Sequence, residues 1–500
     1  MHVQTDANQL RVTIAQGEAQ GRLHQGVRVF CGLPYAAPPV GSLRFEAPQP
    51  AATWNGIRDA GAPGPSAPQP EVTFPGLDMK AIASPGWARG DDYLTLNVWT
   101  PVGASDRPVM VWIHGGGGVI GSKDLAVADG TAFARSGVVC VAINYRLGIE
   151  GFVPIAGAPT NLALRDMLAA LDWVRTNIRS FGGDPDRMTL FGESGGAMCV
   201  SALVASPLAD GIFQRAIIQS GHGSSAFPIS LARRVAEKLA GILKVSPDVA
   251  GFRSVHAEAL IKAQTRIAQP GAVDLRDDAG FDPGIGLGRF NAVYGDDVLP
   301  YPPLEALRHG IGKSVQLLVS TTSEEANFWF IPTKLQWLIP PFAAKWLLGK
   351  SIPRAKDALK AYGLGKLGTR GGAVLNRTLT DLAFRWPARQ FAATHQGLHH
   401  VAEFDWRSTA CNGKLGACHG IDLPFVFDTL PVATGPKGIA GLVAPQTLAT
   451  KVHGLWATFA TDGSLPWPAY DRKTRQVYQL SQSTVVSEPL MPIAAFASTV

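Results

Sequence analysis

Long apolar runs are missing from this sequence, and their absence bears first on membrane insertion. The most hydrophobic stretch, residues 337–348, is interrupted by two prolines and a lysine and is far shorter than the roughly 20 residues that a membrane-spanning helix needs. Residues 1–17 alternate polar and apolar side chains and lack the apolar segment of a signal peptide. We therefore predict no membrane span and a cytoplasmic protein, or a periplasmic or secreted one if a signal peptide has been removed.

Cysteine is also scarce, with five among 500 residues. An odd number cannot pair completely within one chain, and three of the five lie in apolar runs, where buried free thiols are typical. This usage favours a reducing compartment, while the residues leave open whether Cys411 and Cys418 pair. The five positions are Cys31, Cys140, Cys199, Cys411 and Cys418.

Charged residues make up only 17% of the chain and hydrophobic residues 46%, a composition typical of a globular protein with a large core. The net charge is +6, and we interpret Lys and Arg as scattered over a solvated surface, which predicts no nucleic-acid partner. Neither an H-E-x-x-H motif nor paired C-x-x-C motifs occur, so we predict no metal and no other cofactor. The G-x-G-x-x-G string at Gly363–Gly368 follows a helical pattern instead of a strand, so it does not indicate a dinucleotide site.

The most informative segment places a serine between glycines, at Phe191–Ala197 (F-G-E-S-G-G-A). An apolar run, Met188–Leu190, precedes it, and a stretch rich in Ala, Val and Leu follows it. A strand, a sharp turn and a helix are the context of the nucleophile elbow, in which a strained serine projects its hydroxyl from the end of a sheet. An ordinary glycine-rich turn is the alternative for this motif alone. The pattern predicts Ser194 as a nucleophile.

The segments around this motif alternate between strand and helix patterns. Strands are predicted at Val109–Ile113, Val138–Tyr145 and Ala216–Gln219, and apolar residues from Leu164 to Ile178 recur at helical spacing. This order predicts an α/β fold with a mostly parallel central sheet flanked by helices. Residues 225–390 differ, because helical patches there are separated by loops rich in Pro and Gly.

We expect one domain over residues 1–500, with residues 225–390 as a helix-rich cap or insert. Aromatic residues gather between Phe328 and Trp346, and we expect about half of them to be core and the others, including Phe328 and Trp329, to line an apolar substrate pocket. Further strands are predicted at Val315–Ser320 and Val401–Trp406, and a late helix is predicted at Gln446–Thr461.

Two further strings, together with the serine motif, resemble the type-B carboxylesterase family, the cholinesterase-like branch of the α/β-hydrolases. They are Phe30–Phe45 (F-C-G-L-P-Y-A-A-P-P-V-G-S-L-R-F) and Asp91–Trp99 (D-D-Y-L-T-L-N-V-W). The resemblance spans residues 12–470 and implies an α/β-hydrolase fold with helical cap insertions. Secretory members usually carry a cysteine pair where Ala67 and Tyr93 stand, so the resemblance favours a bacterial type similar to para-nitrobenzyl esterases.

The resemblance also assigns an oxyanion hole. His114–Gly118 (H-G-G-G-G) follows a predicted core strand, and its glycines let backbone amides face a substrate oxygen. The implied donors are the amides of Gly116, Gly117 and Gly195. Most family members have an aromatic residue at the position of Gly118, so we expect a wider pocket there that accepts bulky alcohol esters.

The partners of the serine follow from chain order, which in this fold is serine, acid, histidine. Glu324 and Glu325 both follow the strand that ends near Ser320, and the resemblance favours Glu325. Five histidines follow Glu325 in the chain, and ordinary structural roles account for four of them. The fifth, His419, lies in Gly416–Phe425, which resembles the catalytic-histidine loop of the family.

Two neighbours of the triad complete the predicted site. Ser220 resembles a serine that the family places beside the acid, and we expect Glu193 to tune the site electrostatically. The sequence therefore predicts a serine hydrolase that cleaves carboxylic esters, aryl or alkyl, through an acyl-enzyme. Carbamate or amide hydrolysis on the same triad is the alternative, and a non-catalytic binding relative is a third reading. The expected partner is a small ester, and a monomer and a homodimer are both compatible with the sequence.

Overall fold

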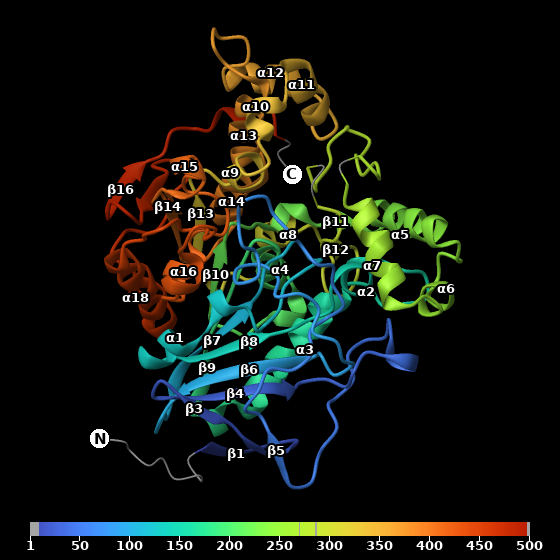
Figure 1. Cartoon of the computed structure of the whole chain (residues 1–500), viewed down its shortest axis with the longest axis vertical. Helices are drawn as coiled ribbons and strands as arrows, with labels where there is room; N and C mark the ends of the chain where they lie inside the picture. The colour runs from blue at the N-terminus through green and yellow to red at the C-terminus, as the bar shows by residue number, and fades with distance from the viewer. Residues whose placement is uncertain (1–9, 270, 286–287, 498–500) are drawn as a thin grey trace.

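A sheet of eleven strands forms the centre of the molecule, in a computed structural model that describes residues 10–269, 271–285 and 288–497 (Figure 1). Seven neighbouring strands, from β8 through β7, β9, β10, β13 and β14 to β15, pair in parallel. Antiparallel strands complete both edges, with β6, β4 and β3 on one side and β16 on the other. The predicted α/β-hydrolase fold is confirmed.

The strands of this sheet, in chain order, are β3 (Arg22–His24), β4 (Val27–Pro34), β6 (Thr95–Pro101), β7 (Arg107–Ile113), β8 (Val139–Ile143), β9 (Gly183–Glu193), β10 (Arg215–Gln219), β13 (Gln316–Thr322), β14 (His399–Phe404), β15 (Gln476–Gln479) and β16 (Thr484–Ser487). A small N-terminal sheet holds β1 (Arg11–Ile14), β2 (Gly17–Gln20) and β5 (Ile57–Asp59), and a two-stranded pair holds β11 (Phe227–Pro228) and β12 (Val293–Tyr294).

The central strands are apolar on both faces because helices cover both faces of the sheet. In β7, Val109 and Val111 point into one core cluster with Leu171 of α3 (Leu162–Asn177), whereas Met110 and Trp112 point into a second cluster on the opposite face. This alternation explains why the strand reads as a continuous hydrophobic run in the sequence. None of the helices in the described part of the chain combines the length and hydrophobicity needed to cross a bilayer.

The helices, in chain order, are α1 (Thr131–Arg135), α2 (Gly148–Phe152), α3 (Leu162–Asn177), α4 (Gly195–Val204), α5 (Ile229–Leu243), α6 (Val249–Arg253), α7 (Ala257–Ile267), α8 (Pro303–Arg308), α9 (Asn327–Phe330), α10 (Leu335–Leu338), α11 (Pro341–Gly349), α12 (Ala355–Ala361), α13 (Gly371–Thr380), α14 (Trp386–Thr394), α15 (Ala410–Gly413), α16 (Leu423–Val426), α17 (Leu430–Ala433) and α18 (Gln446–Asp462).

Residues 225–390 hold helices α5 to α14, with strand β13 of the main sheet among them. A π-helical turn at Asp381–Arg385 joins α13 to α14 without a break in the chain direction. Helices α10 to α13 project from the body of the molecule at the top of Figure 1. Helices α11, α12 and α13 contribute to a third hydrophobic cluster, which also includes Phe330 and Phe384. This cluster places the base of the projection beside the carboxyl ends of the parallel strands.

Candidate active site

Ser194 lies at the turn between β9 and α4, with φ +55° and ψ −124°. Such a backbone conformation is strained for a residue with a side chain and persists only when its surroundings enforce it. The flanking glycines allow it: a Cβ on Gly196 would lie 2.2 Å from the carbonyl oxygen of Ile113, and one on Gly192 would lie 2.8 Å from Gly196. Strand, turn and helix therefore pack too closely for any other residue at these positions.

His419 joins Ser194 to Glu325 in one hydrogen-bonded line. Its Nε2 lies 2.8 Å from the Oγ of Ser194, and its Nδ1 lies 2.7 Å from Oε2 of Glu325. Glu325 is fully buried, and its Oε1 accepts hydrogen bonds from the backbone N–H of Thr322 at 2.8 Å and from Oγ of Ser220 at 2.7 Å. The structure thus brings together the three residues that the sequence predicts as a triad, and it places Ser220 against the acid.

Glu324, the competing acid, points away from the histidine. Its carboxylate pairs with Arg407 and accepts the backbone N–H of Ala417 at 3.0 Å. It therefore holds the start of the loop that carries His419, while Glu325 contacts the imidazole directly. The chain order alone could not separate the two neighbouring acids, because both follow the same strand.

The glycine-rich loop after β7 lies across the turn from Ser194. A Cβ on Gly195 would lie 3.0 Å from the amide nitrogen of Gly117, and one on Gly115 would lie 3.2 Å from the Cβ of Ser194. Gly116 and Gly117 have φ of +103° and +62°, in the region that favours glycine. Backbone amides of this loop and the N-terminus of α4 therefore surround the place where a substrate oxygen would develop negative charge.

Gly118 does not line the large cavity, contrary to our expectation. A Cβ there would lie 2.5 Å from the carbonyl oxygen of Phe290 and 3.1 Å from the ring of Phe152. With a φ of +73°, it lines instead a small pocket that adjoins the large cavity and shares Gly195 and Met198 with it. The absence of an aromatic residue at this position therefore reflects close packing against Phe290 and does not widen the substrate cavity.

Glu193, next to the serine, is a second carboxylate at the histidine. Its Oε1 lies 3.2 Å from Nε2 of His419, and its side chain is buried. Burial raises the pKa of Glu193 above the ordinary value for a glutamate, and a positive charge on His419 acts in the opposite direction. Burial by itself lowers the pKa of His419, but the negative charges of Glu193 and Glu325 outweigh it and raise that pKa. The site thus favours a positive charge on the imidazole.

A cavity of about 450 Å³ opens in front of Ser194, and most of its lining is apolar. Three aromatic rings surround His419, with centroid distances of 6.3 Å for Phe328, 5.0 Å for Trp329 and 4.8 Å for Phe384. Phe328 and Trp329 line the cavity, as the sequence predicted. Phe342 and Trp346 do not, since 74% and 61% of their surfaces are exposed on the projecting helices.

Phe384 escaped the sequence prediction, because the π-helical turn that presents it has no clear sequence signal. His222 was also missed: it is buried in the cavity wall, and its Nε2 donates to the carbonyl oxygen of Ala383 at 2.9 Å. This bond ties the loop after β10 to the turn that carries Phe384. The only sequence signal that places His222 near the site is its position two residues after Ser220.

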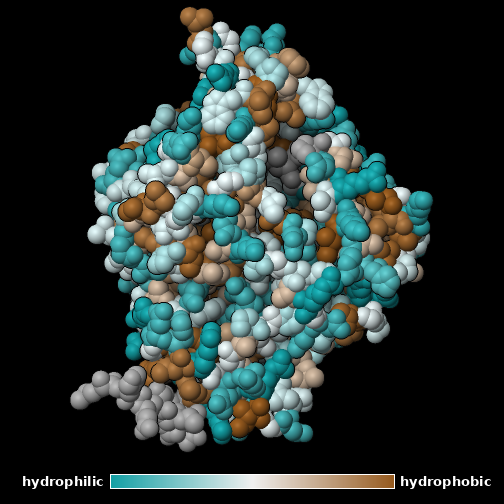
Figure 2. Space-filling view, in the orientation of Figure 1, coloured by the Kyte–Doolittle hydropathy of each residue, from teal (hydrophilic) through white to brown (hydrophobic). Residues whose placement is uncertain are grey.

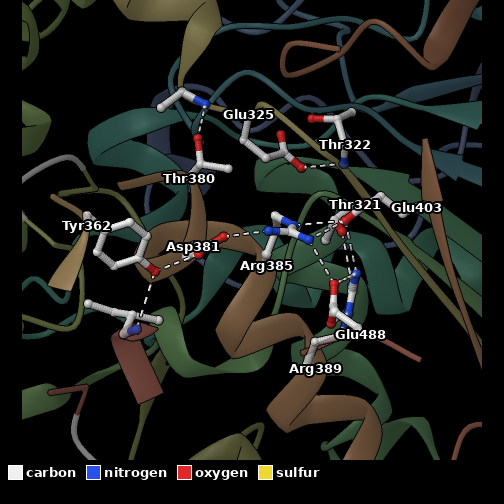
Figure 3. A network of polar contacts seen from close by, with 12 residues as sticks. Thr321, Thr322, Glu325, Tyr362, Thr380, Asp381, Arg385, Arg389, Glu403 and Glu488 are labelled. Carbon is white, nitrogen blue, oxygen red and sulfur yellow. Dashed lines mark hydrogen bonds and ion pairs between the residues drawn. The ribbon is translucent and has the colours of Figure 1, made fainter. Parts of the chain in front are cut away.

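A network of ion pairs holds the π-helical turn in place (Figure 3). Arg385 donates to Asp381 at 2.8 Å and to Glu488 at 2.8 Å, and Arg389 donates to Oγ1 of Thr321 at 3.0 Å. Glu403 of β14 accepts from both arginines. Because Thr321 lies at the end of β13, which precedes the acid loop, the network fixes Phe384 relative to Glu325.

Comparison with known proteins gives a consistent picture. The family model described as the carboxylesterase family matches residues 8–492. The chain is 34% identical over 499 residues to para-nitrobenzyl esterase from Bacillus subtilis (strain 168), covering 96% of each chain. It is 34% identical over 470 residues to phenmedipham hydrolase from Pseudarthrobacter oxydans, covering 91% of each chain.

Solved structures agree with the sequence comparison. A structure of a PNB esterase superposes with a TM-score of 0.82 at 32% identity and covers 96% of this chain and 98% of that one. A carboxylesterase from Geobacillus stearothermophilus superposes with a TM-score of 0.79 at 30% identity, again with coverage of 96% and 98%.

Proposed function

Because the chain belongs to the carboxylesterase family and is a serine hydrolase of carboxylic esters, we propose that it acts through Ser194, His419 and Glu325. The observation that carries this assignment is the continuous line of short contacts from Glu325 through His419 to the Oγ of Ser194. An isolated serine hydroxyl is a weak nucleophile at neutral pH and needs a base that is itself held in the correct tautomer. Glu325 supplies that orientation by accepting the Nδ1–H of His419.

Acylation begins when Oγ of Ser194 attacks the ester carbonyl carbon and its proton moves to Nε2 of His419. The imidazolium is stabilised by Glu325 and by the nearby charge of Glu193. The carbonyl oxygen becomes an oxyanion, which the amides of Gly116, Gly117 and Gly195 stabilise. Collapse of this intermediate breaks the ester C–O bond, and Nε2 returns the proton to the departing alcohol.

Deacylation repeats these steps with water as the nucleophile. His419 takes a proton from the water as it attacks the acyl carbon, and the second oxyanion occupies the same hole. Collapse releases the carboxylic acid and returns the proton to Ser194. The alcohol must leave before the water arrives, which suits a cavity open enough to exchange small molecules.

The lining of the cavity favours apolar substrates, in particular aryl and para-nitrobenzyl esters. Phe328, Trp329 and Phe384 offer flat apolar surface beside His419, and each Å² of apolar surface buried contributes about 25 cal/mol. The name of the para-nitrobenzyl esterase relative supports this substrate class. The side-chain-free run Gly115–Gly117, which lines the cavity, supports acceptance of bulky alcohol groups.

Covalent labelling tests the assignment of the nucleophile. A fluorophosphonate probe reacts with a serine only where a base and an oxyanion hole activate it, so one equivalent is expected to attach to Ser194. Peptide mass spectrometry locates the adduct, and an excess of para-nitrobenzyl acetate should slow its formation by competing for the same cavity. Labelling of another residue, or labelling of protein that was denatured by heat before the probe was added, would contradict the assignment.

Glu193 is expected to shift the pH dependence of the reaction. His419 must be neutral to accept the proton of Ser194, so kcat/KM rises as pH increases through the pKa of its imidazole. Since the carboxylate raises that pKa, Glu193→Gln should lower it and move the acidic limb of the profile to lower pH by about one unit.

The measurement is kcat/KM for p-nitrophenyl acetate against pH in the two proteins. Glu258→Gln serves as the control, since Glu258 lies at the surface on α7 and pairs with Arg89. Its profile should superpose on that of the unmodified enzyme. An unmoved acidic limb in Glu193→Gln would show that this carboxylate does not act on His419.

A further inference from the structure

The net positive charge of the protein comes from the segment that forms the projecting helices α10 to α13. We call residues 334–377 the basic knob. This segment contains nine Lys or Arg and one acidic residue, Asp357, for a net charge of +8. The other residues of the chain hold 36 basic and 38 acidic side chains, so their net charge is −2. Most cations are therefore scattered over the chain and balanced by acids, whereas the excess of positive charge is concentrated in this one projection.

Large apolar side chains are exposed on the same projection. Leu338 of α10 is 69% exposed, Phe342 and Trp346 of α11 are 74% and 61% exposed, and Leu367, in the turn after α12, is fully exposed. Phe342 and Trp346 are four residues apart and so share one face of α11. Figure 2 shows hydrophobic residues among hydrophilic ones at this end of the molecule.

Basic and apolar groups are interleaved on this face. Lys345 precedes Trp346 and is exposed on the same helix. The ammonium of Lys350 lies 3.6 Å from the centroid of the Trp346 ring. Long Lys side chains can extend their charge to one level while an aromatic ring is buried beneath it. Trp, Phe and Leu beside Lys and Arg are the composition of helices that lie in a membrane interface.

We propose that the basic knob docks on an anionic lipid surface, with Phe342, Trp346 and Leu338 entering the interface and the surrounding cations contacting lipid phosphates and carboxylates. A second copy of the chain fits less well, because a symmetric contact would press two +8 surfaces together. Nucleic acid would match the charge but would leave the exposed aliphatic side chains without a partner. The proposal does not depend on the catalytic roles assigned above.

Docking in this way would bring the substrate cavity close to the lipid. Only four residues separate the end of α9 from the start of α10, and Phe328 and Trp329 of α9 line the cavity. The hydrophobic cluster beneath the knob also contains Phe384, which lies against His419, and Ile285, another cavity residue. An apolar ester dissolved in the bilayer would thus reach the cavity over a short distance.

Vesicle binding tests this proposal. The full-length protein is mixed with vesicles of phosphatidylcholine, or of phosphatidylcholine with about a third phosphatidylserine, and the bound fraction is measured by flotation. We expect binding only to the anionic vesicles, and loss of that binding as salt is raised from ~0.05 M to ~0.5 M, because the charges are then screened.

Two double variants separate the contributions. Phe342→Ser with Trp346→Ser removes the apolar groups, and Lys345→Gln with Lys360→Gln removes two cations. Each should lower the vesicle partition coefficient on the order of tenfold. Hydrolysis of p-nitrophenyl acetate in solution should stay at the level of the unmodified enzyme, which shows that the fold is intact.

Matched surface changes outside the knob provide the controls. Leu442 and Val443, in the loop after α17, are 70% and 77% exposed, so their replacement by Ser removes comparable apolar surface. Lys238→Gln with Lys262→Gln removes two exposed cations from α5 and α7. Both controls should bind vesicles like the unmodified protein.

Three results would overturn the proposal. The first is the absence of binding to anionic vesicles at low salt, and the second is equal loss of binding in the knob variants and the controls. The third is a protein dimer in sedimentation velocity that the Phe342 and Trp346 changes dissociate, which would assign the apolar face to a second copy. If the first result is accompanied by tight binding of duplex DNA, the charge is assigned to nucleic acid instead.

Discussion

Replacement of Ser194 by alanine is expected to abolish ester hydrolysis while leaving the protein folded. The triad acts as one unit, and loss of the nucleophile in a serine protease lowers kcat by about 10⁶. The fold should survive, because the Oγ of Ser194 contacts His419 and the sharp turn is held by the close packing of Gly192 and Gly196. Alanine bears the same strained backbone that serine does.

A second serine, Ser201, serves as a control that distinguishes loss of the nucleophile from loss of packing. Ser201 lies on the same helix, α4, is fully buried, and donates its hydroxyl to the carbonyl oxygen of Ala197 at 2.9 Å. Ser201→Ala should retain activity near that of the unmodified enzyme. The measurements are kcat/KM for p-nitrophenyl acetate and thermal unfolding of both variants. More than a few per cent of activity in a well-folded Ser194→Ala protein would refute the role of this serine.

The sequence was sufficient for the parts of the site that depend on local backbone. The nucleophile elbow could be predicted because the turn requires glycine at fixed offsets from Ser194, and close contacts enforce that requirement. The parallel sheet could be predicted because strands covered on both faces are apolar throughout, as in β8. These signals are contained within about ten residues of the chain.

Contacts between distant segments could not be predicted from the sequence in the same way. The sequence suggested that the pocket is wider at Gly118, where no side chain is present. In the structure, the carbonyl of Phe290, far along the chain, occupies the space that a side chain at Gly118 would need. Phe384 reaches His419 through a π-helical turn held by Arg385 and Glu488, which lie 103 residues apart. The periodicity of a segment does not indicate which distant segment will pack against it.

Single substitutions by glutamine are expected to separate the roles of Glu324 and Glu325. In Glu325, Oε1 already accepts two hydrogen bonds, from Thr322 N–H and Ser220 Oγ–H, while Oε2 faces Nδ1 of His419. In Glu325→Gln the amide oxygen should keep the two donors, which turns the amide NH₂ toward the imidazole. Nδ1 must then accept, so the proton resides on Nε2.

That tautomer cannot take the proton of Ser194, since Nε2 already carries one. The expected loss in kcat/KM is about 10⁴, the size of the effect when the equivalent acid of a serine protease is replaced by its amide. Glu324→Gln is the control, because Glu324 binds Arg407 and the N–H of Ala417 without contacting the imidazole. It should lose no more than about tenfold, through slight displacement of the loop that carries His419. Comparable small losses in both variants, measured with p-nitrophenyl acetate at the pH optimum, would show that His419 is oriented by some other group.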